Sequence, residues 1–530
     1  MKSKKLTDAL IIGGGHNGLV CAFYLANAGL NVSIYEKRSI VGGAAVTEEF
    51  HPGFRNSVAS YTVSLLNPKI IKDMNLQGHG LEIVKRPISN FLPIDQSTYL
   101  KLGGGLVRTQ NEFKKFSEKD AAQLPEYYDR IEAVADVLRD LSIKTPPNPK
   151  QGLRAALNAA LQLWPIATKG NQVHRDVYDL FTKSARSFLD SWFENEHIKA
   201  AFGFDSIVGN FASPDTPGSA YVLLHHVFGE VDGEKGAWGH AIGGMGAITQ
   251  AMEKACNDMG VKIFTDTAVN QVIVEDGTAI GIQLDDGNLI KAKKIVSNLN
   301  PKLLYKKLIS EKNLDPEFNR SMDGYKCGSG TFRMNVALSE LPDFSALPGK
   351  ELAEHHQSGI VIAPTLDYMD KAYIDAKSHG WSTAPIVEML IPSTMDSTLA
   401  PEGKHVASLF CQQFSPALPD GSSWQGHRLA AADTIIRTVT KHAPNFRESI
   451  LGMMILSPLD LEEKFGLIGG DIMHGQMTLD QMWAARPLMN YGNYRGPLKS
   501  LYMCGSGTHP GGGVTGLPGK NAAREIIKDL

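Results

Sequence analysis

The sequence predicts an α/β protein built around a doubly wound sheet, and three observations at its start lead to that prediction. A short apolar run at residues 9–12 is typical of a buried strand. The glycine-rich segment 13–18 follows, and residues 19–28 then carry apolar side chains at helical spacing before Gly29 ends the pattern. A second apolar run occupies residues 31–35. The order strand, glycine turn, helix, strand is that of the β-α-β unit from which doubly wound, Rossmann-like sheets are built.

The glycines of this turn have the spacing G-x-G-x-x-G, at Gly13, Gly15 and Gly18. The first permits a tight turn, the second lets the backbone approach a pyrophosphate, and the third allows the helix to pack closely on the strand. Glu36 follows the second strand, 18 residues beyond Gly18, where an acidic side chain can hold ribose hydroxyls. The segment therefore predicts a bound dinucleotide.

Two further glycine segments favour FAD over a nicotinamide. The doublet Gly42-Gly43 resembles the second phosphate-contacting turn of flavoproteins that have two dinucleotide-binding domains. Residues 505–519 contain seven glycines, between an apolar run at 501–504 and a helical pattern at 522–528. So many glycines are costly in chain entropy unless a backbone or a ligand comes very close. Amide groups at the start of the last helix would also stabilise negative charge on a reduced flavin.

The C-terminal segment carries a family resemblance. Its pattern Gly-x-x-Thr-His-Pro-Gly-Gly-Gly-Val-x-Gly, at residues 505–516, resembles the flavin signature of phytoene desaturase-like FAD oxidoreductases, distant relatives of the monoamine oxidases. The resemblance covers essentially the whole chain. It implies a discontinuous FAD-binding domain with a mixed substrate domain of helices and sheet. The FAD-binding segments are residues 1–105, 236–305 and 485–530, and the substrate segments are the helical residues 106–235 and the sheet residues 306–484.

The glycine motifs and the resemblance together predict where FAD binds, without a covalent bond. In the family, the residue that Val269 matches contacts the adenine through its backbone, whereas Val269 by itself is an ordinary strand residue. The predicted cofactor contacts are Gly13, Gly15, Asn17, Gly18, Glu36, Lys37, Gly42, Gly43, Ala44, Val269, Gly505, Ser506, Gly513 and Val514.

The remaining segments supply the substrate side. A sheet roofed by helices suits a cavity above the flavin. The segment 153–164 is amphipathic, and we favour a helix packed on the core over one that contacts a membrane or admits substrate. Expected helices lie at residues 121–141 and 153–164, and expected strands at 331–338, 359–362, 386–391 and 405–411.

Catalytic residues are harder to predict, because a flavin takes up hydride itself and the protein need supply only orientation, a dry site and electrostatics. His225 and His226 end an apolar run, and His474 lies in a glycine-flanked loop, so these three are candidates for proton transfer. A satisfied buried histidine is the alternative for the pair. Arg486 is left open between binding an anion and pairing with a carboxylate, and His509 is expected to shape the glycine loop.

Composition argues against several classes of function. The chain has 53 basic and 56 acidic residues, a net charge of -3 and no long like-charge block, so nucleic acid is a poor partner. Its five cysteines include no C-x-x-C pair, which argues against disulfide reduction and indicates a reducing compartment. We expect no metal site and, without a second G-x-G-x-x-G after a strand, no NADPH domain.

We therefore expect a FAD-dependent oxidoreductase that dehydrogenates or saturates a hydrophobic, isoprenoid-like or lipid-like substrate, with oxygen, a quinone or another protein as electron acceptor. The alternatives are a flavin-bearing regulatory or scaffold protein with little turnover, and an amine oxidase. An amine oxidase needs an aromatic pair beside the flavin, for which Tyr491 and Tyr494 are available. The short stretch before Asp8 and the lack of a long apolar run predict a cytoplasmic location, with peripheral membrane contact left open. No pattern indicates the oligomeric state.

Overall fold

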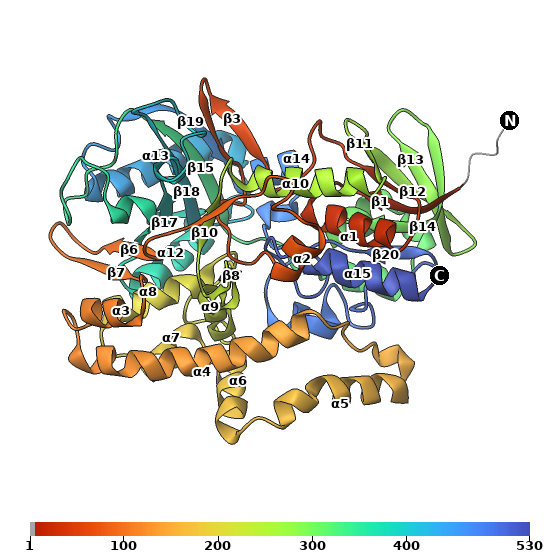
Figure 1. Cartoon of the computed structure of the whole chain (residues 1–530), viewed down its shortest axis with the longest axis horizontal. Coiled ribbons are helices and arrows are strands. Elements are labelled where there is room, and N and C mark those ends of the chain that lie inside the picture. Colours follow the sequence, from red (N-terminus) through yellow and green to blue (C-terminus); the bar gives the residue numbers. More distant parts are fainter. Residues whose placement is uncertain (1–5) are drawn as a thin grey trace.

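Two sheets and a helical arm make up the molecule (Figure 1). The computed structural model describes residues 6–530, except for the side chains of Gln151 and His226. The first sheet lies on the right of Figure 1, the second on the left, and the arm runs beneath both.

The first sheet has a parallel core of five strands, in which β1 lies between β2 and β14, and β11 and β20 lie outside them. An antiparallel meander of β13 and β12 continues from β14. Because the core strands are parallel, their carboxyl ends meet at one edge, where ligands of open α/β sheets bind. The strands are β1 (Thr7–Ile12), β2 (Val32–Tyr35), β11 (Lys262–Phe264), β12 (Val269–Glu275), β13 (Thr278–Leu284), β14 (Leu289–Ser297) and β20 (Leu501–Met503).

Alternate residues of β1 pack into two different hydrophobic cores, one on each face of the sheet. Ala9 and Ile11 pack with three helices on one face of the sheet, whereas Leu10 and Ile12 pack with the meander and α11 on the other. These three helices are therefore neighbours in space although they lie far apart in the sequence. These helices are α1 (His16–Asn27), α10 (Met245–Asp258) and α15 (Leu517–Lys528), with α11 (Pro316–Asp323) on the opposite face. The observed layers confirm the predicted α/β class.

The second sheet has the order β19-β15-β18-β17-β16-β6-β7 and is antiparallel except where β16 meets β6. Helix α13 (Trp424–His442) covers one face, and short helices of residues 185–228 lie toward the other. Two of its strands, β6 and β7, lie within residues 1–105, which were assigned to the first FAD-binding segment. The strands are β6 (Asn90–Pro93), β7 (Tyr99–Leu102), β15 (Thr331–Leu338), β16 (Gly359–Ile362), β17 (Trp381–Leu390), β18 (His405–Phe414) and β19 (Ile450–Leu456).

Short elements connect these layers. The hairpin β3–β4 and the pair β5–β10 link the first sheet to the second, and β8 pairs with β9. Their bounds are β3 (Thr47–His51), β4 (Phe54–Ser57), β5 (Ile83–Lys85), β8 (Glu230–Val231), β9 (Glu234–Lys235) and β10 (Gly239–Ala241). The remaining helices outside the arm are α2 (Pro68–Asp73), α3 (Leu106–Phe113), α7 (Ala185–Asp190), α8 (Glu196–Gly203), α9 (His225–Phe228), α12 (Leu366–His379) and α14 (Pro458–Phe465).

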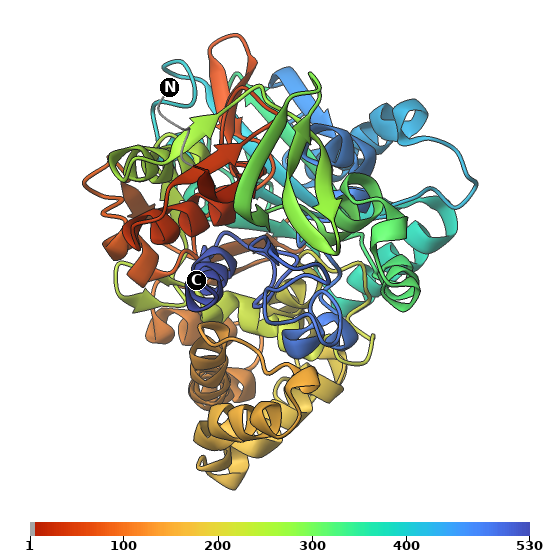
Figure 2. The same ribbon diagram turned by 90° about the vertical axis from the view of Figure 1, so that its right-hand side faces the viewer.

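The arm consists of α4 (Glu118–Ser142), α5 (Leu153–Ala167) and α6 (Asn171–Thr182), and it extends away from both sheets (Figures 1 and 2). Helix α5 does not pack on the core, which corrects the favoured interpretation of its sequence. Ala155 is its only buried residue, and Leu153 is 84% exposed. None of the helices described is long and apolar enough to cross a membrane.

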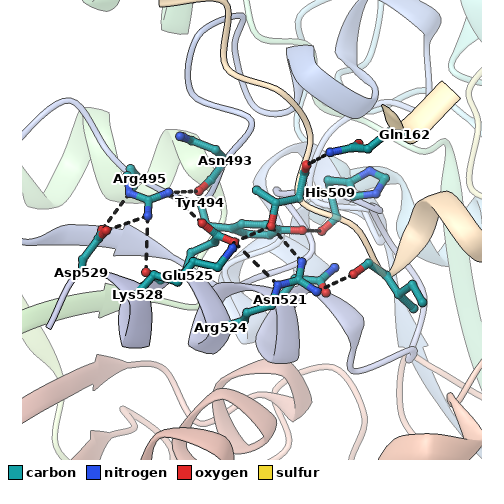
Figure 3. A network of polar contacts seen from close by, with 12 residues as sticks. Gln162, Asn493, Tyr494, Arg495, His509, Asn521, Arg524, Glu525, Lys528 and Asp529 are labelled. Atoms are coloured by element: carbon teal, nitrogen blue, oxygen red, sulfur yellow. Dashed lines mark hydrogen bonds and ion pairs between the residues drawn. The ribbon is translucent and has the colours of Figure 1, made fainter. Parts of the chain in front are cut away.

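A polar network holds the arm against α15 (Figure 3). Asn521 donates a hydrogen bond to the carbonyl of Ser142 over 2.9 Å, and Arg524 donates to the carbonyl of Ile143 over 2.7 Å. The Thr145 hydroxyl donates to Glu525 over 2.6 Å. The end of α4 is thereby fixed to the last helix of the FAD-binding side.

The close packing of α15 on α1 gives a first testable prediction. A Cβ atom on Gly519 would lie 2.1 Å from the backbone oxygen of Asn17, so Gly519→Ala must separate the two helices. We expect a loss of about 1–3 kcal/mol or more in the free energy of unfolding. The control is Gly426→Ala in α13, where a Cβ meets nothing within 4 Å and a gain of about 0.4–1 kcal/mol is expected. Chemical unfolding measures both, and equal effects would contradict the packing argument.

Candidate functional site

A cavity of about 320 Å³ lies at the carboxyl edge of the first sheet and continues to the second. Its walls come from segments far apart in the sequence, which the two sheets bring together. The lining includes the turn after β1, residues 42–45 and 59–66, the start of β12, residues 298–300, residues 472–474, and Ser506, Gly513 and Val514.

The glycines of the first turn are required by close contacts. Gly13 has a φ of +92°, which favours glycine over other residues. A Cβ on Gly15 would lie 2.5 Å from the side-chain nitrogen of Asn298, and one on Gly18 would lie 2.5 Å from the oxygen of Gly13. The third glycine therefore permits close packing of helix and strand, as its position in the motif predicts.

Glu36 is fixed at the cavity wall by backbone donors. One carboxylate oxygen accepts a hydrogen bond from the N–H of Gly14 over 2.7 Å, and the other accepts one from the N–H of Arg38 over 2.9 Å. The side chain is buried yet lines the cavity. Each carboxylate oxygen has further lone pairs, so the group can also accept hydrogen bonds from ribose hydroxyls.

Buried polar atoms without partners test whether a dinucleotide fits. Within residues 6–530, five such atoms belong to side chains that line the cavity: Nε2 of His16, Oδ1 of Asn17, Oγ of Ser64, Nδ1 of His225 and Nδ1 of His474. Leaving such groups unpaired costs stability, so a ligand that supplies donors and acceptors here would offset the cost. The pyrophosphate and the ring amides of FAD supply such groups, and FAD therefore fits this wall.

Arg486 holds the C-terminal glycine loop in place. Its guanidinium is fully buried and donates to the carbonyl oxygens of Ser506 over 2.9 Å and of Met473 over 2.6 Å. It donates further to the carbonyls of Gly475 and Gln481. The sequence did not decide whether Arg486 binds an anion or pairs with a carboxylate. In the structure its hydrogen-bond partners are backbone carbonyl groups instead.

His474 lies in the loop that Arg486 and Asp471 fix. The Asp471 carboxylate accepts from the N–H groups of Met473 and Gly475, and burial raises its pKa to about 6. Burial, with the nearby His16 and Arg486, lowers the pKa of His474 to about 3. The imidazole is therefore neutral near pH 7 and a weak base, so it can form hydrogen bonds there but holds an added proton poorly.

Most predicted cofactor contacts line this cavity, although their contact with FAD stays a prediction. Gly18 and Gly505 lie behind the wall as packing positions, because a Cβ on Gly505 would lie 2.5 Å from the oxygen of Asn298. Lys37 is exposed at the rim. The lining members are Gly13, Gly15, Asn17, Glu36, Lys37, Gly42, Gly43, Ala44, Val269, Ser506, Gly513 and Val514.

Two of the three candidate catalytic histidines lie on the wall of the same cavity. His474 and His225 both line the cavity, and Nδ1 of His225 lies 3.6 Å from Oδ1 of Asp205, which is too long for a hydrogen bond. His226 lies in α9 beside His225, but its side chain is outside the described residues. The role of all three in catalysis stays a prediction.

Sequence reasoning missed the aromatic wall. The rings of Tyr61 and Phe410 stack with their centroids 5.0 Å apart, and both residues line the cavity with Trp238. Tyr491 and Tyr494, considered for an amine oxidase, lie elsewhere: Tyr491 packs on Phe318, and Tyr494 donates to a backbone carbonyl. No local pattern marks the aromatic wall, because its members come from different segments.

The low pKa of His474 predicts how stability depends on pH. The folded pKa of about 3 lies below the unfolded value of 6.5, so the unfolded chain takes up the proton first and stability falls as pH drops below about 6.5. The loss approaches about 1.4 kcal/mol per pH unit for this group. We expect His474→Asn, which tolerates the φ of +59°, to make the slope shallower. Urea unfolding at several pH values measures this, and an equal change in the exposed control His379→Asn would contradict the assignment.

Comparison with known proteins agrees with this geometry. The family described as flavin containing amine oxidoreductase matches residues 18–331. The chain is 39% identical to pyridine nucleotide-disulfide oxidoreductase domain-containing protein 2 of Rattus norvegicus, over 99% of this chain and 94% of that one. It is 24% identical to the lycopene-forming phytoene desaturase of Pantoea ananas, over 98% and 99%. The fold is similar to cyclohexylamine oxidase from Brevibacterium oxydans, with a TM-score of 0.57 and 14% identity over 99% of each chain. The chain thus belongs to the flavin-containing amine oxidoreductase family and is a FAD-dependent oxidoreductase.

Proposed function

We propose that the enzyme dehydrogenates or saturates an apolar, lipid-like molecule held between the two sheets. The observation that carries this proposal is the continuity of one cavity from the dinucleotide-binding turn to an apolar wall. When bound, FAD supplies hydride transfer. The tasks of the chain are to bind the substrate, orient it and exclude water from it.

The apolar wall is suited to these tasks. The stacked rings of Tyr61 and Phe410 present a flat surface, and Val208, Leu467 and Ile472 extend it. Burying apolar surface contributes about 25 cal/mol per Å², so a hydrocarbon gains affinity without any charged partner. His225 and His474 remain the candidates for accepting the proton released on dehydrogenation, although its lowered pKa makes His474 a weak base.

The relatives support an apolar substrate over an amine. The phytoene desaturase of Pantoea ananas is named for a hydrocarbon and is 24% identical to this chain, whereas cyclohexylamine oxidase is 14% identical. The stacked Tyr61 and Phe410 also contact each other, and so leave no slot between their rings for an amine carbon.

Anaerobic mixing of the FAD-loaded protein with polyenes, unsaturated lipids and amines tests the proposal. We expect only apolar compounds to bleach the oxidised flavin or to reoxidise the dithionite-reduced flavin. Heating should release all FAD into the supernatant. Phe410→Leu should slow the reaction about tenfold by removing ring contacts, whereas Phe50→Leu on β3 should not, because Phe50 packs on a separate cluster that includes Phe54 and Leu399, outside the cavity lining. Bleaching by amines alone would contradict the proposal, and a flavin that no donor or acceptor cycles would favour the scaffold alternative.

We also propose that α5 contacts an anionic membrane surface. Leu153, Leu157, Leu161 and Trp164 form an exposed apolar stripe on this helix, with exposed fractions from 65% to 84%. Residues 141–175 contain five lysines and arginines and no aspartate or glutamate. An apolar stripe flanked by basic residues favours binding in the interface of anionic lipids.

Vesicle sedimentation tests this second proposal. The protein should sediment with vesicles of phosphatidylglycerol and phosphatidylcholine more than with phosphatidylcholine alone. The double variant Leu157→Glu, Leu161→Glu should reduce binding about tenfold or more, because two leucines that would enter the lipid interface are lost. Leu429→Glu, at a 67% exposed position of α13, is the matched control and should bind as the wild type does. Unchanged binding of the double variant would rule out α5 as the contact.

A further inference from the structure

A second chamber of about 450 Å³ adjoins the cofactor cavity. The two share Tyr61, Val208, His225 and Trp238 as wall residues. Beyond the shared residues, this chamber has charged side chains of its own on its wall, including Arg86 and Glu388. Nothing in the hydride-transfer chemistry of a flavin uses these charges.

Arg86 lies near enough to Glu388 for the two charges to interact, but it makes no direct ion pair. Its guanidinium donates to the hydroxyl of Thr62 and lies 5.8 Å from the centre of the Trp238 ring. Among the described residues, no carboxylate oxygen lies within 4.0 Å of it. The residue is half-buried and lines the chamber. A desolvated guanidinium without a counter-ion is costly, and a bound anion would offset that cost.

The second sheet places Glu388 on the wall of this chamber and Arg333 on the same face of the sheet. Arg333, Phe410 and Glu388 are in register on β15, β18 and β17, so their side chains share one face. Glu388 is buried and accepts a hydrogen bond from the hydroxyl of Tyr61. The Arg333 guanidinium lies 4.6 Å from the centre of the Tyr61 ring, and its Nε and Nη1 have no partner.

Three of the four carboxylates on the chamber wall lie beside partners other than Arg86. Glu132 forms ion pairs with Arg139 and Lys235, and Glu388 accepts a hydrogen bond from the hydroxyl of Tyr61. Burial raises the pKa of Glu388, and the nearby Asp205 adds to this rise while Arg86 and Tyr61 oppose it. Asp205 itself lies beside His225. Arg86 is therefore the charged group with the most unused hydrogen-bonding capacity toward the chamber.

We propose that the second chamber binds the carboxylate head of an amphipathic acid, with Arg86 as its partner, while the apolar tail passes Tyr61 and Trp238 toward the flavin. A carboxylate accepts two parallel N–H bonds from a guanidinium, a geometry that a hydroxyl such as that of Thr62 does not satisfy. This inference rests on the proposed apolar substrate and adds a polar end to it.

Binding of parinaric acid, a fluorescent polyene acid, and of its methyl ester to the FAD-loaded protein tests the proposal. We expect the acid to bind about tenfold more tightly than the ester. Arg86→Gln should abolish that preference, Arg86→Lys should keep part of it, and Glu388→Gln should strengthen it severalfold by removing a competing negative charge. Arg437→Gln, at an exposed position of α13, is the control and should keep the full preference. Flavin content and thermal unfolding establish that each variant is folded.

The outcomes separate this inference from the proposed function. Equal binding of acid and ester would overturn the head-group site and leave the apolar cavity in place. Weaker acid binding in Glu388→Gln, or tight binding of the corresponding polyene amine that depends on Glu388, would show a cation site and also overturn it. The third outcome is an Arg86-dependent preference for the acid in a protein whose flavin is reduced by no polyene. This result would support the head-group site in the chamber but contradict the proposed reaction.

Discussion

The cofactor side of the structure depends on close backbone contacts around one residue, Asn298. Its side chain fills the space beside Gly15 and Gly18, and its carbonyl lies against Gly505. Residue 298 follows β14, the central strand to which β1 and β20 both pair. Three chain segments thus converge on the carboxyl edge of a single strand. Glycine is required at these positions because any side chain would separate the segments that form the cavity wall.

The fold could be predicted largely from local patterns. The expected strands at 331–338 and 359–362 coincide with β15 and β16, because each is an apolar run bounded by turn residues. The last helix begins at Leu517, five residues before the expected start, since Leu517 and Pro518 lie in a segment dominated by glycines. Pairing of β6 with β16 could not be predicted, because the two strands are more than 260 residues apart and nothing local specifies that register.

Some residues of the candidate site could likewise be predicted from local patterns, whereas others could not. Gly13, Glu36 and Gly513 lie in motifs whose spacing reflects the shape of a dinucleotide, so the sequence alone indicates them. Arg86, Phe410 and Glu388 lie in ordinary strands or next to one, and only the tertiary structure brings them to a common wall. The contact made by the apolar face of α5 could not be predicted for a different reason. An amphipathic pattern indicates that one face of a helix is apolar, but it does not indicate what covers that face.

Formation of the cavity wall by residues from both ends of the chain affects when the protein can acquire FAD. The loop of residues 505–519 and the helix α15 complete a site that begins at Gly13, and Arg486 fixes that loop through carbonyl groups. During synthesis, the first β-α-β unit leaves the ribosome long before this loop exists. Cofactor loading must therefore follow translation of the last helix, and a prematurely terminated chain would remain colourless and without its ligand's contribution to stability.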